Sequence, residues 1–445
     1  MSDSHAQALT EKSSFERPLL ERPLLERHRA VMPAWVALYY DEPIEIVSGE
    51  GCRVTDADGR TYLDFFAGIV TNSLGYDVAE VREAVERQLR TGIVHTSTLY
   101  LLRGQVELAE KIARLSGIED AKVFFTNSGT EANEAALLLA TYARKSNQVL
   151  AMRQSYHGRS FGATSITANR TWKNNGLSPL TVYFLHGGDR HLPQFRGLSD
   201  AAFIEACVED LRHTLITVSA GDVAAFIVEP VQGVGGYTYP PDGLYAAYKE
   251  VLDEYGILFI SDEVQTGWGR TGRNFWGIAN YGVTPDMMTF AKGTGNGFVI
   301  GGVVARGALM DAPHATGLST FGGNPISTAA AGATIDYILD HDLQANADAV
   351  GGLIIEGLRD AAARLPIVTD VRGLGLMFAI ELRDPALAAR LLEETKARGL
   401  LVGKGGLYGN TIRMAPPLTL SEDEAKEGLG ILVDSLEAIN GDAAP

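Results

Sequence analysis

The stretch GILFISDEVQTG, residues 256–267, joins an apolar run to two adjacent carboxylates, Asp262 and Glu263. A short apolar run after a glycine predicts a strand buried on both faces, as in a parallel sheet. Successive strand residues point to opposite faces, so the two carboxylates cannot both enter one site, and a hydrolase with paired carboxylates is excluded. The carboxyl end of such a strand is where open α/β sheets bind ligands, with Val264 on the same face as Asp262. A metal ligand or a surface residue would explain a lone carboxylate equally well.

Similar short apolar runs alternate with longer amphipathic stretches on both sides of this segment. This alternation is typical of parallel strands joined by crossover helices and predicts an α/β fold with a mostly parallel central sheet covered by helices. After residue 324 longer helical stretches predict a smaller α+β domain, closed by a helix that starts with a capping box, Ser421 with Glu424. The predicted strands are 122–125, 149–152, 224–228, 257–260, 287–290, 302–305, 375–382 and 400–402, and the predicted helices include 131–145, 244–255 and 386–398.

The composition excludes several classes of protein. A net charge of -17 repels nucleic acid and anionic membrane surfaces, and no apolar run approaches the roughly 18 residues of a membrane span. The only cysteines, Cys52 and Cys207, are too few for a disulfide framework or a cysteine-rich metal site, and no signal segment opens the chain. We therefore expect a cytoplasmic protein without a bound metal. The repeat ERPLL at 16–20 and 21–25 contains helix-breaking prolines and predicts a flexible arm over residues 1–30.

The segment FFTNSGTEAN, residues 124–133, runs from a predicted strand into an alanine-rich helix. Its helix start offers unpaired N–H groups, the positive end of the helix dipole and the hydroxyls of Ser128 and Thr130 around Gly129. These groups suit a phosphate. A helix capped by Ser128 or Thr130 would explain the same residues without any ligand.

Two further segments place a reactive or planar side chain after a predicted strand. In TFAKGTGNG, residues 289–297, apolar surroundings would lower the pKa of Lys292 and favour the neutral amine that attacks an aldehyde, although most lysines are solvated surface charges. In QSYHGR, residues 154–159, Tyr156 could stack on a planar ring or be an ordinary core tyrosine.

Six motifs together resemble the class III aminotransferases, in the same order and with the same spacing, over residues 33 to 435 or so. They are NSGTEAN at 127–133, YHG at 156–158, EPVQG at 229–233, DEVQTG at 262–267, KG at 292–293 and TFGGNP at 320–325. Within that class, FFAGIV at 65–70, LLVGKG at 400–405 and IRMAP at 412–416 look most like the alanine:glyoxylate branch, which is similar to the β-alanine and 3-aminoisobutyrate:pyruvate enzymes.

The resemblance implies fold type I of the enzymes that depend on pyridoxal 5'-phosphate, with a small domain built from both chain ends. We expect the N-terminal part of the small domain at 31–75, the large cofactor-binding domain at 76–325 and the C-terminal small domain at 326–445. The resemblance also implies a homodimer with shared active sites.

The residue roles follow from the same resemblance. Lys292 would hold the cofactor as a Schiff base and later move a proton, and Asp262 would pair with the pyridine nitrogen. Tyr156 and Val264 would stack on the ring, and Gln265 would bind its phenolic oxygen. The phosphate would lie at Ser128, Gly129 and Thr130 with Thr320 of the second subunit, whereas His157 would only orient the tyrosine and is not counted as catalytic.

Arg413 is predicted to project from a short strand of the small domain toward the cleft, where its planar fork suits the carboxylate of a 2-oxo acid. A donor without a carboxylate on its reacting carbon would leave that charge unpaired. We hypothesise that Glu229, at the same sheet edge, then pairs with Arg413. A permanent salt bridge or a solvated arginine is the alternative.

The predicted function is transfer of an amino group from alanine or a β- or ω-amino acid to pyruvate or glyoxylate. Within the same fold, the alternative reactions are those of a decarboxylase, a racemase or an aminomutase. A further alternative is an aminotransferase whose acceptor is of the 2-oxoglutarate type. A nucleotide-binding oxidoreductase is disfavoured because residues 127–130 are not the Gly-x-Gly-x-x-Gly fingerprint. A scaffold role would leave Lys292, Asp262 and Tyr156 unexplained together.

Overall fold

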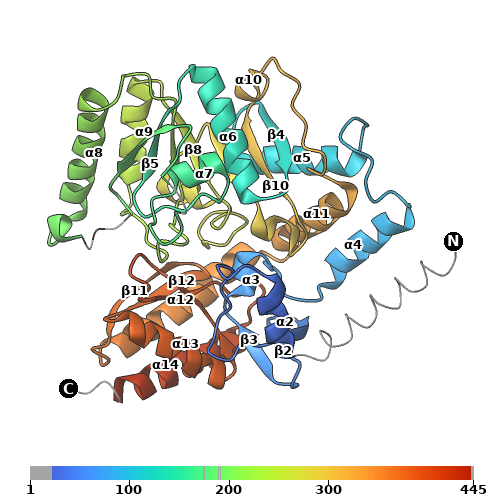
Figure 1. Ribbon diagram of the computed structural model, residues 1–445, viewed down its shortest axis with the longest axis vertical. Coiled ribbons are helices and arrows are strands. Elements are labelled where there is room, and N and C mark those ends of the chain that lie inside the picture. Colours follow the sequence, from blue (N-terminus) through green and yellow to red (C-terminus); the bar gives the residue numbers. More distant parts are fainter. Residues whose placement is uncertain (1–22, 174–175, 189, 191, 442–445) are drawn as a thin grey trace, which may run out of the picture.

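The computed structural model describes residues 23–173, 176–188, 190 and 192–441. Figure 1 shows a larger part above a smaller one, with the first and last described segments both in the smaller part. A seven-stranded sheet forms the centre of the larger part, and two four-stranded sheets lie in the smaller part. The chain therefore folds as the predicted large α/β domain with a smaller α+β domain made from both chain ends.

The central sheet has the strand order β4-β10-β9-β8-β7-β5-β6. The strands from β9 to β6 are mutually parallel, whereas β10 is antiparallel to both neighbours, so the sheet is mostly parallel as predicted. The strands are β4 Ala121–Thr126, β5 Gln148–Met152, β6 Thr181–Leu185, β7 Ala225–Val228, β8 Leu258–Asp262, β9 Met287–Phe290 and β10 Gly301–Arg306.

Side chains alternate between two apolar cores along these strands. On β5, Val149 and Ala151 join the core on one face, whereas Leu150 and Met152 join the core on the other. Both faces are covered by helices, and for that reason the inner strands are apolar at successive positions rather than at every second one.

Helices α6, α7 and α10 pack on one face of the sheet, and α5, α8 and α9 contribute to the core on the other. Their bounds are α5 Arg103–Ser116, α6 Gly129–Arg144, α7 Phe161–Ile166, α8 Asp200–Thr217, α9 Leu244–Glu254 and α10 Gly307–Met310. Three short 3-10 helices complete this part: η1 Pro193–Phe195, η2 Gly277–Tyr281 and η3 Lys292–Gly295.

The smaller part joins the two ends of the chain through backbone pairing. Leu400 and Leu401 of β13 pair in parallel with Leu63 and Asp64 of β3, so a C-terminal strand completes an N-terminal sheet. One sheet has the order β1-β2-β3-β13 and the other β11-β12-β15-β14. The strands are β1 Ile46–Glu50, β2 Arg53–Asp56, β3 Thr61–Asp64, β11 Val368–Leu374, β12 Met377–Leu382, β13 Leu400–Leu401, β14 Gly403–Gly405 and β15 Thr411–Met414.

The remaining helices are α2 Leu24–Val31, α3 Ala67–Val70, α4 Ala79–Arg90, α11 Pro325–Asp340, α12 Leu343–Ala362, α13 Pro385–Ala397 and α14 Glu422–Gly441. The predicted capping box opens α14: the Ser421 N–H donates to Glu424 Oε2 (3.0 Å), and the Glu424 N–H donates to Ser421 Oγ (3.3 Å). Helix α2 begins within the predicted arm, residues 1–30, and ends one residue beyond it. Pro23 directly precedes its first residue, a position where the missing N–H loses no helical hydrogen bond. Residues 1–22 of the predicted arm lie outside the described residues.

No described helix combines the length and the apolar character that a membrane span requires.

Candidate active site

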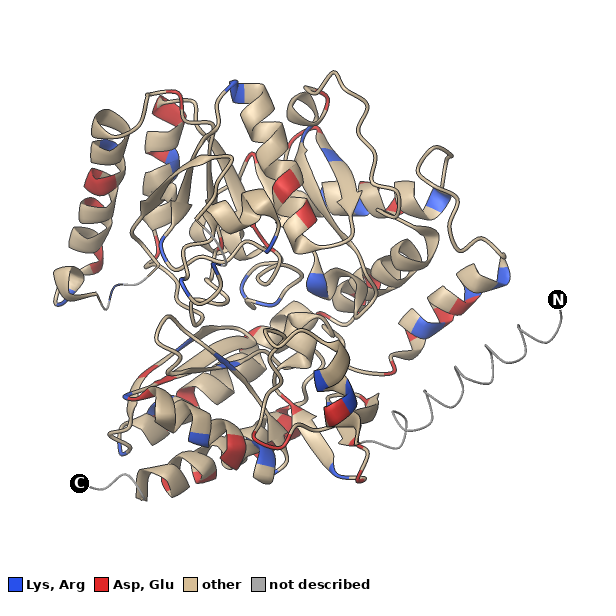
Figure 2. Cartoon of the chain, viewed as in Figure 1, with Lys and Arg blue, Asp and Glu red and all other residues tan. Residues whose placement is uncertain are grey.

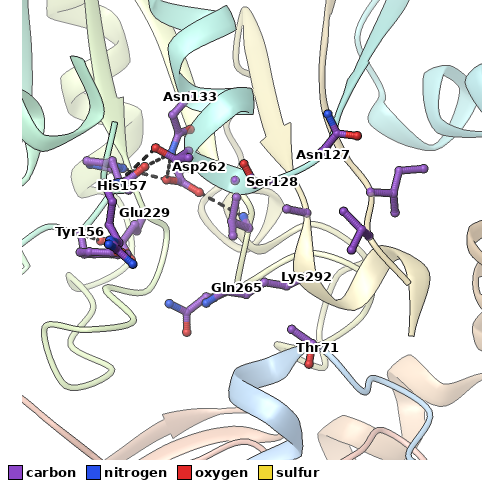
Figure 3. Close-up of a pocket in the computed structure, with 18 of the residues that line it drawn as sticks. Thr71, Asn127, Ser128, Asn133, Tyr156, His157, Glu229, Asp262, Gln265 and Lys292 are labelled. Atoms are coloured by element: carbon purple, nitrogen blue, oxygen red, sulfur yellow. Dashed lines mark hydrogen bonds and ion pairs between the residues drawn. The ribbon is translucent and has the colours of Figure 1, made fainter. Parts of the chain in front are cut away.

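A cavity of about 380 Å³ opens at the carboxyl ends of β5, β7, β8 and β9, beside the start of α6. Figure 3 shows that its side chains converge from segments far apart in the sequence. All the predicted site residues except Arg413 and Thr320 line it: Ser128, Gly129, Thr130, Tyr156, Glu229, Asp262, Val264, Gln265 and Lys292. The structure therefore brings together residues that the sequence linked only by motif.

Lys292 follows β9 after a single intervening residue, Ala291, and projects into the cavity. Burial, aided by the positive guanidinium of Arg413, lowers the pKa of its amine to about 8. A larger fraction of the amine is therefore neutral near pH 8 than for a solvated lysine, and the neutral form is the nucleophile. Its backbone φ of 44° is unusual for a residue with a side chain.

Asp262, the last residue of β8, is only 3% exposed. Its Oδ1 accepts from the Val264 N–H (3.1 Å), and its Oδ2 accepts from Asn133 Nδ2 (2.8 Å) and lies 2.8 Å from His157 Nδ1. Thr289 Oγ1 donates to Asn133 Oδ1 (2.7 Å), which fixes the amide so that its nitrogen faces the carboxylate. The carboxylate is thus oriented from three sides (Figure 3).

Glu263 points to the opposite face, as the strand alternation predicted. Its carboxylate accepts from the hydroxyls of Ser261 (3.2 Å) and Thr266 (2.5 Å) and from the N–H groups of Gly277 (2.9 Å) and Ile278 (2.8 Å). This buried group caps the start of η2, and it does not line the cavity.

Asn133 and His157 both contact Asp262, and the sequence interpretation gave neither of them that role. Asn133 lies four residues after Gly129 on α6, so helical periodicity places it on the same side of the helix. His157 was assigned only to orienting Tyr156, but its ring contacts Asp262 instead. The spacing within NSGTEAN was a usable signal for Asn133, whereas the partner of His157 depends on tertiary packing.

The start of α6 offers backbone N–H groups to the cavity, with Ser128 as the N-cap. Ser128 Oγ accepts from the Glu131 N–H (3.3 Å). The Thr130 hydroxyl accepts from the N–H groups of Arg159 (3.1 Å) and Ser160 (3.0 Å), so it is already used by the neighbouring loop. A Cβ on Gly158 would lie 2.4 Å from that hydroxyl, and this close approach requires glycine.

Tyr156 and Gln265 supply a ring and an amide to the cavity. The Tyr156 N–H donates to Glu229 Oε1 (2.8 Å), and its ring meets the edge of Trp172 with centroids 5.5 Å apart. Burial raises the pKa of Tyr156, which keeps the phenol neutral. Gln265 Oε1 is buried without a hydrogen-bond partner among the described residues, as expected of an atom that serves a ligand.

Glu229 and Arg413 are both buried, but no ion pair joins them. Glu229 accepts from the N–H groups of Tyr156 (2.8 Å) and Gly233 (2.9 Å), whereas Arg413 donates to the carbonyls of Gly233 (2.9 Å) and Lys404 (3.1 Å). Burial raises the pKa of Glu229 to about 7. The hypothesised pair is therefore absent here, because backbone groups satisfy each partner.

Thr320 lies outside the cavity of its own chain and is exposed to solvent, in a loop just before α11. Phe321 beside it is 59% exposed and packs against the ring of His95 in a tilted arrangement, with centroids 4.7 Å apart.

Comparison with known proteins identifies the family. Residues 37–436 match the family model of the class-III aminotransferases, so the chain belongs to this family. It is 37% identical to alanine–glyoxylate aminotransferase 2 homolog 2 of Arabidopsis thaliana, over 90% of this chain and 84% of the relative. It is also 38% identical to an acetylornithine aminotransferase of Caldanaerobacter subterraneus (90% and 96% covered) and 33% identical to an alanine/serine racemase of Pyrococcus horikoshii (88% and 85% covered).

Comparison with solved structures supports the same family assignment. An (S)-enantioselective ω-transaminase from Thermomicrobium roseum superposes with a TM-score of 0.83 at 33% identity, covering 96% of each chain. The protein is an aminotransferase, and its cofactor is pyridoxal 5'-phosphate.

The cavity residues fit this cofactor. A lysine amine of lowered pKa suits its aldehyde, helix N–H groups suit its phosphate, and a buried carboxylate suits its ring nitrogen. Gln265 lines the same cavity, where the Nε2 group of its amide can donate to the oxygen on the remaining edge of the ring.

Proposed function

We propose that this aminotransferase moves an amino group from alanine or a β- or ω-amino acid to a small 2-oxo acid, pyruvate or glyoxylate, by a ping-pong mechanism. The observation that supports this proposal best is Arg413, a guanidinium only 3% exposed that has no carboxylate partner among the described residues. It is close enough to Lys292 to lower the pKa of the amine. A substrate carboxylate would complete the coordination of this buried charge.

Each cavity residue has a proposed task. The bound cofactor supplies an electron sink for the substrate's Cα electrons. Lys292 Nζ would hold the cofactor through its aldehyde, and as a free amine it would take the proton from the substrate's Cα. Asp262 keeps a proton on the pyridine nitrogen, since its negative charge favours the protonated ring. Asn133 and His157 hold the Asp262 carboxylate in place.

The other residues bind and orient the cofactor. Tyr156 and Val264 contact the faces of its ring, and Gln265 binds the phenolic oxygen. Ser128, Gly129 and Thr130 receive the phosphate. Because the Thr130 hydroxyl already accepts two backbone N–H groups, we assign its part in phosphate binding mainly to its amide.

Glu229 and Arg413 could still pair while an ω-amino donor is bound. Gly233 lies between them, since its N–H donates to Glu229 and its carbonyl accepts from Arg413. We propose that the Arg413 guanidinium exchanges this carbonyl for Glu229 when no substrate carboxylate is present, and for the substrate when one is.

We further propose a cytoplasmic homodimer whose sites are shared through Thr320. Cys52 and Cys207 are both unpaired, in keeping with a reducing compartment. Leu99, Tyr100 and Leu101 are exposed by 75%, 68% and 97%. A second copy of the chain would cover such an apolar surface.

Half-reaction spectra with a panel of amines test the substrate proposal. Alanine or a β- or ω-amino acid should convert the bound cofactor fully to its amine form and release one equivalent of oxo product, without any acceptor. A racemase or decarboxylase would return the cofactor to its original form. If acetylornithine converts the cofactor and only 2-oxoglutarate restores it, the proposed substrates are wrong although the aminotransferase class stands.

A further inference from the structure

We infer that Asn296 is a positioning residue for Lys292: its side-chain amide fastens the loop that carries the lysine to the segment 73–75 of the smaller part. The inference rests on the proposed role of Lys292. It concerns how the lysine is held, not whether the lysine reacts.

The need for such a fastening arises from the backbone of Lys292. Its φ of 44° lies in the left-handed region, which costs free energy for a residue with a Cβ. A strained residue of this kind persists only where the surrounding structure leaves it no alternative. The loop after β9 turns at once into the short 3-10 helix η3, Lys292–Gly295, and ends at Asn296, which is also left-handed with φ 44°. Asparagine tolerates that conformation better than most residues.

Asn296 makes two hydrogen bonds in opposite senses to adjacent residues. The Leu74 N–H donates to Asn296 Oδ1 (2.8 Å), and Asn296 Nδ2 donates to the Gly75 carbonyl (3.0 Å). Two bonds to one amide fix its plane as well as its position. They therefore fix the far end of the lysine loop.

The near end of the loop is pressed against the same segment. A Cβ added to Gly293 would lie 2.1 Å from Ser73 Oγ and 3.3 Å from the Val70 carbonyl, so a side chain there would force Ser73 to move. Figure 3 shows Thr71, two residues before Ser73, on the side of the cavity that carries Lys292. The loop is thus held at both ends by one stretch of chain.

That stretch is itself anchored in the smaller part. The Leu418 N–H donates to the Ser73 carbonyl (2.6 Å), and Thr419 Oγ1 donates to the Leu74 carbonyl (3.1 Å). The segment also continues from β3 through α3, where Asp64 Oδ1 accepts from the N–H groups of Phe66 (2.8 Å) and Ala67 (3.0 Å). Asn296 therefore ties the lysine of the larger part to a fixed point of the smaller one, and its loss would let Lys292 relax toward an ordinary φ and displace Nζ.

The test compares Asn296→Gly and Asn296→Asp in the holoenzyme. Glycine keeps the left-handed backbone at no cost but loses both hydrogen bonds. Aspartate keeps the acceptor for Leu74 and loses the donor to Gly75. Asn410→Ala is the matched control, because Asn410 Nδ2 also binds a carbonyl far along the chain, that of Leu382 at the end of β12 (2.7 Å), and its hydrogen bonds among the described residues do not reach the lysine loop.

With alanine as donor, we expect Asn296→Gly to lower the single-turnover rate constant by about 10- to 100-fold, since small misplacements of a reacting group are costly. The alanine concentration at half-saturation should hardly change, the pH at which the absorbance of the lysine-bound cofactor titrates should shift, and Asn296→Asp should lie between glycine and the parent. The Asn410→Ala rate should match the parent.

Parental rates and an unshifted titration in both Asn296 variants would overturn the inference, as would an equal rate loss in Asn410→Ala. If Asn296→Gly does not fold, Asn296→Asp decides alone. Lys292→Ala distinguishes a failure of the proposed function from a failure of the positioning role of Asn296. An active Lys292→Ala enzyme would contradict the proposed function. An inactive one beside a fully active Asn296→Gly defeats only the positioning role.

Discussion

At the scale of single residues, burial of Lys292 gives a pH dependence that differs from that of an exposed lysine. Its pKa of about 8, against an ordinary 10.5, means that the amine is neutral above pH 8. The rate at which apoenzyme attaches the cofactor aldehyde should therefore rise with pH up to about 8 and then level off. Stopped-flow absorbance across pH 6 to 10.5 or so measures this. An attachment rate of the parental apoenzyme that kept rising to pH 10 would contradict the lowered pKa. As a control, Lys292→Ala should bind cofactor without the attachment signal and show no turnover.

Asp262 carries the second prediction. Asp262→Asn keeps the size of the side chain and can still bind Asn133, but a neutral amide cannot hold the pyridinium charge. The rate of the first half-reaction should fall by about 10²-fold or more, as for loss of other preorganised charge partners. Cofactor content, measured by absorbance after dialysis, should stay near one per chain. A parental half-reaction rate would show that Asp262 does not act on the ring nitrogen.

The sequence indicated Asp262 because an apolar strand ends there and because successive strand side chains point to opposite faces, which separates Asp262 from Glu263. The structure has both features. It did not indicate that His157 would contact the carboxylate. Neighbouring positions along one strand follow from local geometry, but a contact between the β5 loop and the end of β8 depends on how the whole sheet is ordered. The absent Glu229–Arg413 pair is a case of the same kind, because the backbone of Gly233 satisfies both partners.

At the scale of elements, the inner strands were predictable because both of their faces are buried. β6, Thr181–Leu185, was missed because it is an edge strand in which only Leu185 is fully buried. β4, at the other edge, ends in the buried Phe125 and Thr126 and was predicted. The antiparallel direction of β10 also escaped, since an apolar run does not state its direction. Helix α11 packs against α4 and α5, so contacts cross the domain boundary that we propose at residue 325.

Strand β15 carries Arg413 to a position beside the rings of Phe66 and Tyr237. The guanidinium carbon lies 5.6 Å from the centroid of each ring. Arg413→Ala should weaken pyruvate or glyoxylate binding by about 10²-fold, the usual effect of losing a charge-assisted pair. The first half-reaction from an ω-amine should hardly change. Separate half-reaction titrations measure the two effects, and equal losses in both, or none in either, would refute the carboxylate role.

At the scale of the whole molecule, the distribution of charged side chains does not support a nucleic-acid-binding surface. Figure 2 shows acidic and basic residues interspersed over the helices of both parts. Two exposed regions are candidates for contact with a second copy of the chain: the apolar loop around Leu101 and the neighbourhood of Thr320 and Phe321. Only the resemblance of the TFGGNP motif to the family assigned Thr320 to the partner's cavity. The residue types around it do not, because that assignment depends on how two copies meet.

Subunit complementation tests the shared site. Thr320→Ala should weaken cofactor binding and leave little activity at limiting cofactor, and Lys292→Ala should be inactive. If Thr320 serves the partner's cavity, a mixed dimer places both substitutions in one site and restores an unaltered Lys292 and Thr320 in the other. Unfolding the two variants together and refolding them should therefore recover activity at limiting cofactor.

If all subunits associate with equal affinity, about half of the reassembled dimers are mixed. Each mixed dimer has one intact site out of two, so the recovered activity per chain should be about a quarter of the parental value. The control is each variant refolded alone, and the mixed dimer can be isolated with two different affinity tags. If Thr320 acts in its own subunit, the mixed dimer has one site without the lysine and one without the threonine. No site is then intact, and the isolated mixed dimer would show no recovery above the Thr320→Ala level.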